Sequence, residues 1–445
     1  MIKISLFPIR LNDHNVPDWQ SGLRKSAATL LMLLLSLLAF VACETLEFAD
    51  PNSPTAEATT VQNLVTGVEA GARIDFDIYL RVVSVLGREA YYFEPSDPRY
   101  TGELMKGPLD PGGFLVTRSW EGRYTVIGTC NILLQKAAND RGVAGFAKTM
   151  IAYQLLLNHN YTYDNGIKID FSGGAVPVLK AREALAAIAA KLDEAQADLQ
   201  AAGGAFSFGL SSGFTGFNTP ANFIKFNRAL KARVAVYQGG LDAAKYSDAI
   251  TALGLSFLDP AGALDLGVYH AHSTSSSDLL NPLYEIPAAP SIKLYGHPIF
   301  KRDAAAGDTR YSSKIFERSP ATTFDGLTSN LAPTVAKGST DRFPIIRNEE
   351  LILLRAEASI GLGNLAAAQT DINLVRSKAG LGPVTLTAAE ALNQLLNEKR
   401  YSLFLEGHRW IDLRRYNKLD DRTLVPLDRT GDVIIRQVPL PRTEG

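Results

Sequence analysis

Histidines are among the residues of this 445-residue chain whose type and spacing could do chemistry. His270 and His272 stand two positions apart and could supply two ligands to a metal ion. A protein metal site needs three or four ligands, and no third stands beside them at a recognisable spacing. We therefore expect a structural or solvated role for both, and no bound metal. His408 lies in a charged helical segment and is expected to be structural as well.

Carboxylates are plentiful enough to supply an acid and a base for glycoside hydrolysis. Such a pair must face each other across a cleft, which the sequence cannot show. For the densest charge cluster, which has helical spacing near the C-terminus, we expect an ion-pair network that locks the last helices. The cluster consists of Glu398, Arg400, Glu406, Arg409, Asp412 and Arg414.

Patterns for nucleotide chemistry are weak. Gly361, Gly363 and Ala366 match the letters of a dinucleotide-binding fingerprint, but a helix precedes them where the fingerprint requires a strand. Turn glycines explain the match. A formal net charge of -1 gives no basis for binding nucleic acid, whose partners concentrate basic charge. We expect neither a cofactor nor a nucleic-acid partner.

Aromatic rings could form a ligand platform, because a flat ring and its hydrogen-bonding neighbours suit an amphipathic sugar. Trp120 and Trp410 lie in predicted helices, where core packing is favoured. Residues 87–117 interrupt the helical period with a long loop, and long loops often carry function. The candidate ligand-binding residues in this loop are Tyr91, Tyr92, Phe93 and Tyr100. Packing within the loop is the alternative, and a second candidate set is Tyr269, Tyr284 and Tyr295.

Most of the chain shows the 3.6-residue period of amphipathic helices, and 46% of it is hydrophobic, enough for a large core. Helices are expected over residues 59–86, 119–138, 145–159 and 222–237, with an alanine-rich helix after Val-Pro-Val at 176–178. Residues 203–217 form a glycine- and serine-rich loop whose four phenylalanines either pack on the body or meet a ligand. Residues 256–342 are expected to form irregular loops and short strands.

A helical hairpin is expected over residues 347–380. Leu351, Leu354 and Ala358 form an apolar stripe, Gly363 turns the chain, and Asn364 can cap the second helix. Two helices joined by a tight glycine turn are typical of a tetratricopeptide unit. A hairpin cannot bury its apolar face alone, so we expect the next helix, over residues 388–405, to cover it.

The N-terminus has the features of a secretory signal. Arg24 and Lys25 precede an apolar run over residues 27–42, which is too short to span a bilayer comfortably and ends in small residues before Cys43. The only other cysteine is Cys130. If Cys43 is modified, no disulfide can form within the chain; the alternative is a soluble secreted protein with one disulfide between the two.

Three blocks near the C-terminus resemble the signature of the SusD/RagB family. They are R-N-E-E-L-I-L-L-R-A-E-A from residue 347, N-L-V-R-S-K-A-G-L from residue 373 and N-E-K-R-Y-S-L-F-L-E-G-H-R-W-I-D-L-R-R from residue 397. Trp120, Tyr124, Ile127 and Asn131 are similar to the W-x3-Y-x2-I-x3-N helix of that family. Phe-Val-Ala-Cys at residues 40–43 resembles a bacterial lipobox, in which the cysteine receives a lipid.

The resemblance implies a mostly α-helical, tetratricopeptide-like scaffold with an irregular, loop-rich, ligand-facing region. It also implies a surface lipoprotein of the outer membrane, lipidated at Cys43 and without catalysis of its own. Such a protein captures an oligosaccharide or peptide and closes as a lid over a SusC-like TonB-dependent β-barrel transporter. The alternatives are a surface glycan hydrolase, which would turn its ligand over, and a helical-repeat assembly factor, which would bind protein.

The expected organisation of the chain has four segments. Residues 1–42 are a lipoprotein signal peptide and residues 43–58 a lipidated tether, whose acidic, proline-containing sequence suits an extended conformation. Residues 59–255 form an N-terminal SusD-like helical region. Residues 256–445 form a C-terminal SusD/RagB-like region, intertwined with the first in one domain.

Overall fold

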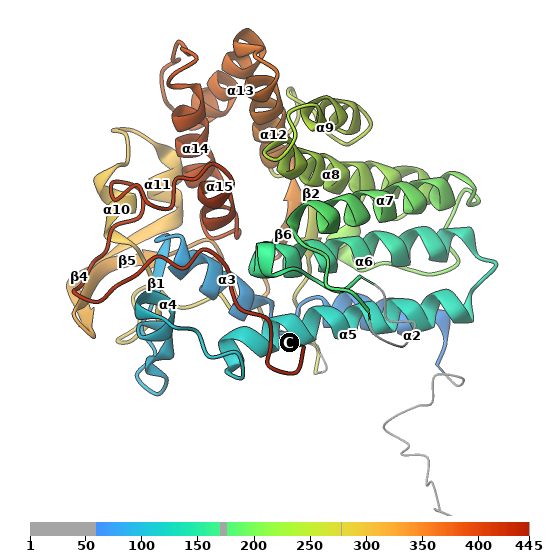
Figure 1. Cartoon of the computed structure of the whole chain (residues 1–445), viewed down its shortest axis with the longest axis horizontal. Coiled ribbons are helices and arrows are strands. Elements are labelled where there is room, and N and C mark those ends of the chain that lie inside the picture. Colours follow the sequence, from blue (N-terminus) through green and yellow to red (C-terminus); the bar gives the residue numbers. More distant parts are fainter. Residues whose placement is uncertain (1–58, 170–175, 277, 445) are drawn as a thin grey trace, which may run out of the picture. The chain divides into compact units, whose positions relative to one another are not determined.

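Helices dominate the computed structural model, which describes residues 59–169, 176–276 and 278–444 (Figure 1). The longer N-terminal helices are α2 (Val61–Gly71), α3 (Phe76–Leu86), α5 (Phe114–Lys136), α6 (Arg141–Thr162), α7 (Ala181–Gln200), α8 (Pro220–Gly239) and α9 (Lys245–Gly254). Several begin at a residue whose side chain accepts a backbone N–H left free by the first turn. Thr60 accepts from Asn63 at 3.1 Å and Asp140 accepts from Val143 at 3.0 Å.

The C-terminal helices are α12 (Asn348–Gly361), α13 (Leu365–Lys378), α14 (Ala391–Ser402) and α15 (Arg409–Arg415). Shorter helical segments are η1 (Pro98–Tyr100), α4 (Glu103–Lys106), η2 (Tyr163–Asn165), η3 (Ser212–Phe214), α10 (Pro298–Arg302) and α11 (Thr309–Lys314). The predicted hairpin is confirmed. Gly363 turns the chain with a φ of 75°, and the Asn364 side chain accepts from the Ala367 N–H at 3.2 Å.

The single helix expected over residues 59–86 was wrong, because α2 and α3 are separate. Asp75 adopts a φ of 54°, a left-handed conformation that ends a right-handed helix. Arg123 of α5 fixes this break. Its guanidinium donates to the Ala72 carbonyl at 2.8 Å and contacts the carbonyl of Ile74.

Two antiparallel sheets complete the fold. A four-stranded sheet has the order β1-β3-β5-β4, and β2 pairs with β6 in a separate sheet. The strands are β1 (Ala90–Tyr92), β2 (Gly267–His270), β3 (Leu294–Gly296), β4 (Ile315–Phe324), β5 (Leu327–Pro333) and β6 (Phe343–Arg347). Asp325 and Gly326, both with positive φ, form the two-residue turn between β4 and β5. The short strands predicted within residues 256–342 are therefore present.

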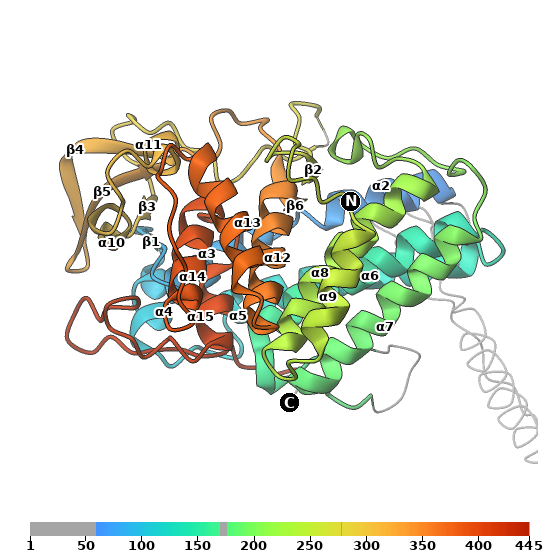
Figure 2. The same cartoon turned by 90° about the horizontal axis from the view of Figure 1, so that it is seen from above.

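Figures 1 and 2 show how these elements are arranged. Helices α5 to α9 lie side by side in chain order, and α14 and α15 lie between them and the four-stranded sheet. The ring of Tyr246 in α9 lies against both Gly239 of α8 and Gly361 of α12, where a Cβ at either position would overlap it. These two glycines allow the three helices to approach closely.

A buried ion-pair network joins α12, α14 and α15. Lys399 donates to Glu357 at 2.9 Å and pairs with Asp412 at 2.7 Å, and Arg415 contacts both carboxylates at 2.6 Å. The ion-pair network predicted for the last helices was wrong in its membership, because of its six expected residues only Asp412 belongs to this one. Glu398 pairs with Arg310 and Arg376, Arg400 with Asp303, and Glu406 with Arg347, while Arg409 and Arg414 donate to backbone carbonyls.

Candidate binding site

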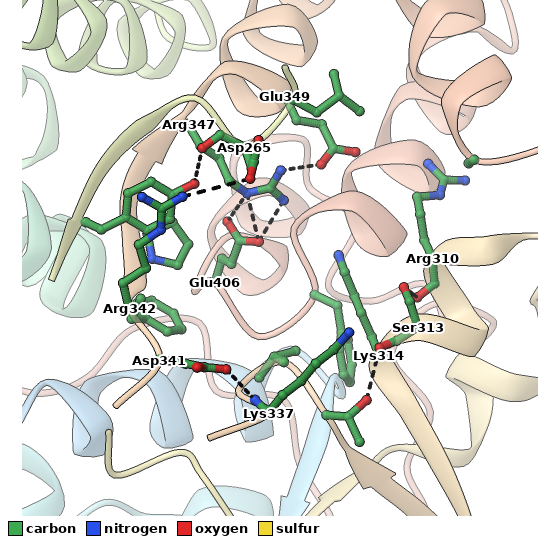
Figure 3. Close-up of a pocket in the computed structure, with 18 of the residues that line it drawn as sticks. Asp265, Arg310, Ser313, Lys314, Lys337, Asp341, Arg342, Arg347, Glu349 and Glu406 are labelled. Carbon is green, nitrogen blue, oxygen red and sulfur yellow. Dashed lines mark hydrogen bonds and ion pairs between the residues drawn. The ribbon is translucent and has the colours of Figure 1, made fainter. Parts of the chain in front are cut away.

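A cavity of about 560 Å³ lies beside the two-stranded sheet, and Figure 3 shows its lining. Strand β2 supplies Tyr269, β6 supplies Phe343 and Arg347, and α11 supplies Arg310 and Lys314. The rest of the wall comes from the segments around β2, β5 and β6, from the start of α12 and from the ends of α13 and α14. We refer to this cavity as the β2–β6 cavity. Its walls join parts of the chain from residue 264 to residue 406.

One side of the β2–β6 cavity is an aromatic ring stacked on a guanidinium. The hydroxyl of Tyr269 donates to the carbonyl oxygen of Asp265, which holds the ring in place. The guanidinium carbon of Arg342 lies 3.9 Å from the centre of that ring, where the π-electrons attract a cation. Arg342 remains 54% exposed. The stacked pair therefore offers a flat surface and free hydrogen-bond donors together.

Arg347 closes the inner end of the cavity. It contacts Glu349 and donates to Glu406 at 2.8 Å and to the Ser402 carbonyl at 2.6 Å. Burial alone would raise the pKa of Glu349, but the charges of Arg347 and Lys314 outweigh it and hold that pKa below its ordinary value. Both carboxylates are therefore engaged by the arginine.

Two lysines complete the polar lining. The Lys314 amino group donates to the carbonyls of Tyr401, at 2.7 Å, and Ser402, which the end of α14 leaves without helical partners. Burial, reinforced by the charge of Arg347, lowers the pKa of Lys314 to about 8. Figure 3 shows the Lys337 side chain directed into the same space, while its backbone N–H donates to Asp341 at 2.7 Å.

A second cavity, of about 610 Å³, is bounded by α2, the loop before η3 and the segment after β2. Arg73 of α2 pairs with Asp278 and donates to the Ala271 carbonyl. Burial raises the pKa of Glu69, whose carboxylate accepts from the Ser211 N–H at 3.2 Å. Tyr269 lines this cavity as well as the first.

Residues 209–213, G-L-S-S-G, match the letters of a hydrolase nucleophile elbow, which places its serine between a strand and a helix. Here they lie in a loop that enters the short segment η3, with no strand before them. The phenylalanines of this region pack on the body, as one of the two expectations had it. Phe208, Phe214 and Phe217 are buried, and Phe206 is half-buried against Phe208.

The predicted ligand-binding residues of the loop at 87–117 are buried. Tyr91, Tyr92, Phe93 and Tyr100 are 3% to 7% exposed. The Tyr91 hydroxyl lies 3.1 Å from His297 Nε2, and the Tyr92 and Tyr100 rings lie 4.5 Å apart. None of the four lines either cavity described above. Their role in binding stays a prediction.

The second candidate set separates in the structure. Tyr269 lines both cavities, whereas Tyr295 is buried against Phe93 and donates to Thr322 at 2.8 Å. Tyr284 is half-buried and lines neither of these two cavities. Of the three tyrosines, only Tyr269 is placed where a ligand in these cavities could meet it.

The histidines considered as metal ligands take up protein contacts. His270 is buried with its Nε2 atom 3.2 Å from the Tyr153 hydroxyl, and His272 Nδ1 lies 3.1 Å from the Leu279 carbonyl. Within residues 59–169, 176–276 and 278–444, no three histidine, cysteine, aspartate or glutamate side chains are grouped to hold a metal ion.

Of the two cysteines, the structure describes Cys130. Cys130 is a free, buried thiol in α5, and burial raises its pKa. Cys43, the predicted lipidation site, lies outside the described residues. Among the helices of the described residues, none has the length and hydrophobicity that a membrane crossing needs.

Sequence reasoning missed the charged lining of the β2–β6 cavity. Lys314, Lys337 and Arg342 lie in the region expected to be irregular, and no motif singles them out. Arg347 was noticed only as the start of a helix. Tyr269 is the one lining residue that residue type had marked as a candidate for ligand binding.

Comparisons with known proteins bear on the fold. Residues 321–434 match the model of the SusD family. No curated protein matches the chain. The structure is similar to a surface glycan-binding protein A from Bacteroides uniformis (TM-score 0.66, 16% identity, covering 86% of this chain and 96% of that one).

Two further solved structures show the same fold. One is a surface glycan-binding protein A from Bacteroides thetaiotaomicron in complex with laminarihexaose (TM-score 0.65, 15% identity, 86% and 96% coverage). The other is a SusD superfamily protein from Bacteroides vulgatus (TM-score 0.62, 14% identity, 87% and 96% coverage). The predicted fold, a tetratricopeptide-like helical scaffold of the SusD type, is confirmed.

Proposed function

The chain belongs to the SusD/RagB family through its segment 321–434, and from this premise we propose that it is a nutrient-binding lipoprotein of the cell surface. It binds oligosaccharides and delivers them to a SusC-like TonB-dependent transporter in the outer membrane, acting as its lid. The similar structures named for glycan binding support the choice of oligosaccharide over peptide.

The observation that carries the proposal is the β2–β6 cavity. Its volume of about 560 Å³ suits a small-molecule or sugar ligand. The Arg342 guanidinium, stacked on the Tyr269 ring, supplies a flat face and donors, and Phe343 and Phe404 add apolar lining. Sugars present apolar ring faces and hydroxyl edges, which match this combination.

The proposed protein binds its ligand without catalysis. A glycosidase needs one carboxylic acid free to give a proton and a second free to act as base or nucleophile. Glu349 and Glu406, at the inner end of the cavity, both accept from Arg347, and the pKa of Glu349 is held below its ordinary value. These carboxylates are poorly suited to that chemistry.

The N-terminal part of the proposal concerns membrane attachment. Residues 1–42 would be removed as a signal peptide, Cys43 would receive the lipid, and residues 43–58 would tether the binding domain, built from the 59–255 and 256–445 regions. Replacement of Cys43 by serine is expected to move the protein from the membrane fraction to the soluble fraction. Unlabelled wild-type protein after feeding of labelled fatty acid would refute the anchor.

Ligand binding is tested with the full chain purified in detergent. Isothermal titration calorimetry with a β-glucan hexasaccharide and with a peptide of similar mass should show saturable binding of the sugar, which is recovered intact. Saturable binding of the peptide but not of the sugar would show that the ligand is a peptide. Cleavage of the sugar would favour the hydrolase. Affinity capture from the native envelope should recover a β-barrel transporter, and recovery of other proteins alone would refute that partnership.

A further inference from the structure

Basic side chains outnumber acidic ones around the β2–β6 cavity, in a chain whose formal net charge is -1. The basic lining residues are Arg310, Lys314, Lys337, Arg342, Arg347 and Lys378. The acidic lining residues are Asp265, Asp341, Glu349 and Glu406. This excess of basic residues attracts an anion only if the acidic residues do not cancel it. The local charge therefore depends on which of these residues form ion pairs.

Two of the four acids are held by one base. Glu349 and Glu406 both pair with Arg347. The carboxylate of Asp341 accepts the backbone N–H groups of Lys337, at 2.7 Å, and of Gly338, at 3.1 Å. These donors are neutral, so Asp341 keeps its negative charge. Asp265 is 76% exposed and lies 3.9 Å from Arg342, a distance at which solvent weakens the attraction.

Several bases have no carboxylate partner. Arg310 is fully engaged by Asp308 and Glu398. Lys314, in contrast, donates only to backbone carbonyls, although its charge also acts on the Glu349 carboxylate. In the part of the chain that the structure describes, no ion pair joins Lys337 or Lys378 to a carboxylate, and both are exposed.

The bases that have no close ion pair among the described residues line the same cavity. Figure 3 shows the Lys314 and Lys337 side chains directed into the space in front of Arg347. Lys378 lies in the last turn of α13, on the lining of the same cavity, and Arg342 lies across it on the Tyr269 ring. Charges of one sign around a concave, partly apolar surface concentrate their field and attract the opposite sign.

We infer that the β2–β6 cavity takes an anionic sugar unit, carrying a carboxylate or a sulfate group, so that the preferred ligand is an acidic oligosaccharide. This inference rests on the proposed function, because it names the class of glycan that the same site binds. Lys337, Lys378 and Arg342 meet the anionic group directly, and Lys314 adds its charge from the wall.

The test compares three hexasaccharides by calorimetry on the full chain: a neutral glucan, an oligogalacturonate and a sulfated oligosaccharide. Titrations are run at about 0.05 M and about 0.5 M salt, since salt screens the attraction of exposed charges. Lys337→Gln and Lys378→Gln each remove one positive charge from an exposed side chain that has no ion pair within the described part of the chain. Lys225→Gln, on the exposed face of α8 and outside both cavities, is the control with the same charge change.

Wild type should bind one acidic ligand about tenfold more tightly than the neutral one at low salt, and this ratio should shrink at high salt. The ratio should fall about two- to fivefold in each cavity variant and stay unchanged in Lys225→Gln. The acidic ligand that shows the preference identifies the anionic group as carboxylate or sulfate.

Three results would overturn the inference. Binding of the neutral glucan with equal or greater affinity overturns it and leaves the proposed function standing. An equal fall of the ratio in Lys225→Gln overturns the assignment to this cavity. If none of the three sugars binds, the proposed glycan-binding function fails together with the inference.

Discussion

The guanidinium carbon of Arg342 lies 3.9 Å from the centre of the Tyr269 ring, which joins the segment before β6 to strand β2. The two side chains differ in exposure. Tyr269 is 5% exposed and fixed by its hydroxyl, whereas the Arg342 side chain is 54% exposed. The arginine can therefore be changed without loss of the core, which makes it the better probe of this cavity.

Replacement of Arg342 by alanine should weaken oligosaccharide binding about tenfold, because the cavity loses hydrogen-bond donors and one half of its flat surface. The melting temperature should stay within a few degrees, as for other exposed side chains. Calorimetry and thermal unfolding measure the two effects. Arg118→Ala, at 56% exposure on α5, is the matched control. Equal affinities in all three proteins would remove Arg342 from the site.

Replacement of Tyr92 by alanine should destabilise the fold by about 3 kcal/mol, as expected for truncation of a large buried ring. The ring packs 4.5 Å from Tyr100, and the Arg81 guanidinium lies 4.4 Å from its centre. Urea unfolding measures the cost, and Tyr284→Ala, at a half-buried ring, should cost less. A Tyr92→Ala protein with native stability but no affinity for a glycan would instead support the predicted binding role of this loop.

Replacement of Lys399 by methionine should cost about 3 to 5 kcal/mol, since Glu357 and Asp412 would share Arg415 as their remaining cationic partner in a buried site. Guanidinium unfolding measures the loss. Lys191→Met, at a partly exposed i,i+3 pair with Glu194, should remain close to wild type. A Lys399→Met protein as stable as that control would show that the network adds little to stability.

His159 should make the fold less stable in mild acid. Burial, together with the charge of Arg414, lowers its pKa to about 3 in the folded protein, while the unfolded side chain keeps a value near 6.5. Between these values only the unfolded chain takes up the proton, so stability falls as the pH drops below about 6.5. At pH 5 the loss from this residue is about 2 kcal/mol.

The measurement compares wild type with His159→Gln by urea unfolding at about pH 7 and about pH 5. The drop in unfolding free energy between the two should be about 2 kcal/mol smaller in the variant. The pKa values of His270, His297 and His408 are also lowered by burial, and these residues remain in both proteins, so their effect cancels. An identical drop in both proteins would contradict the assignment to His159.

The C-terminal helices could be predicted because their determinants are local. The apolar stripe of α12, the turn at Gly363 and the cap at Asn364 lie within a few residues of one another, and each appears in the structure as expected. Trp410, predicted to be a core residue from its helical spacing, is fully buried and donates to the Ile435 carbonyl at 2.9 Å.

The break between α2 and α3 could not be predicted because it depends on a distant side chain. The Arg123 guanidinium, about fifty residues later, donates to the carbonyls of Ala72 and Ile74. Burial of the loop aromatics has a similar origin. Strand β1 pairs Tyr91 with Tyr295 in β3, a contact that no local pattern announces.

The candidate site was predicted only in its aromatic part for the same reason. Tyr269 could be singled out by residue type, but the cavity exists because β2 pairs with β6 and because Lys314 reaches the end of α14. Each of these contacts joins residues more than seventy positions apart. Types and spacings within one segment carry no information about them.

The ring of Tyr246 lies against Gly239 and Gly361, so the residue type at position 246 limits the residue types that positions 239 and 361 can accept. While the tyrosine is present, any larger residue at either glycine must displace the ring, so both positions are held at glycine by a single distant side chain. In descendants of this sequence, a smaller residue at position 246 would free both glycines at once. Substitutions at these three positions are therefore expected to be correlated.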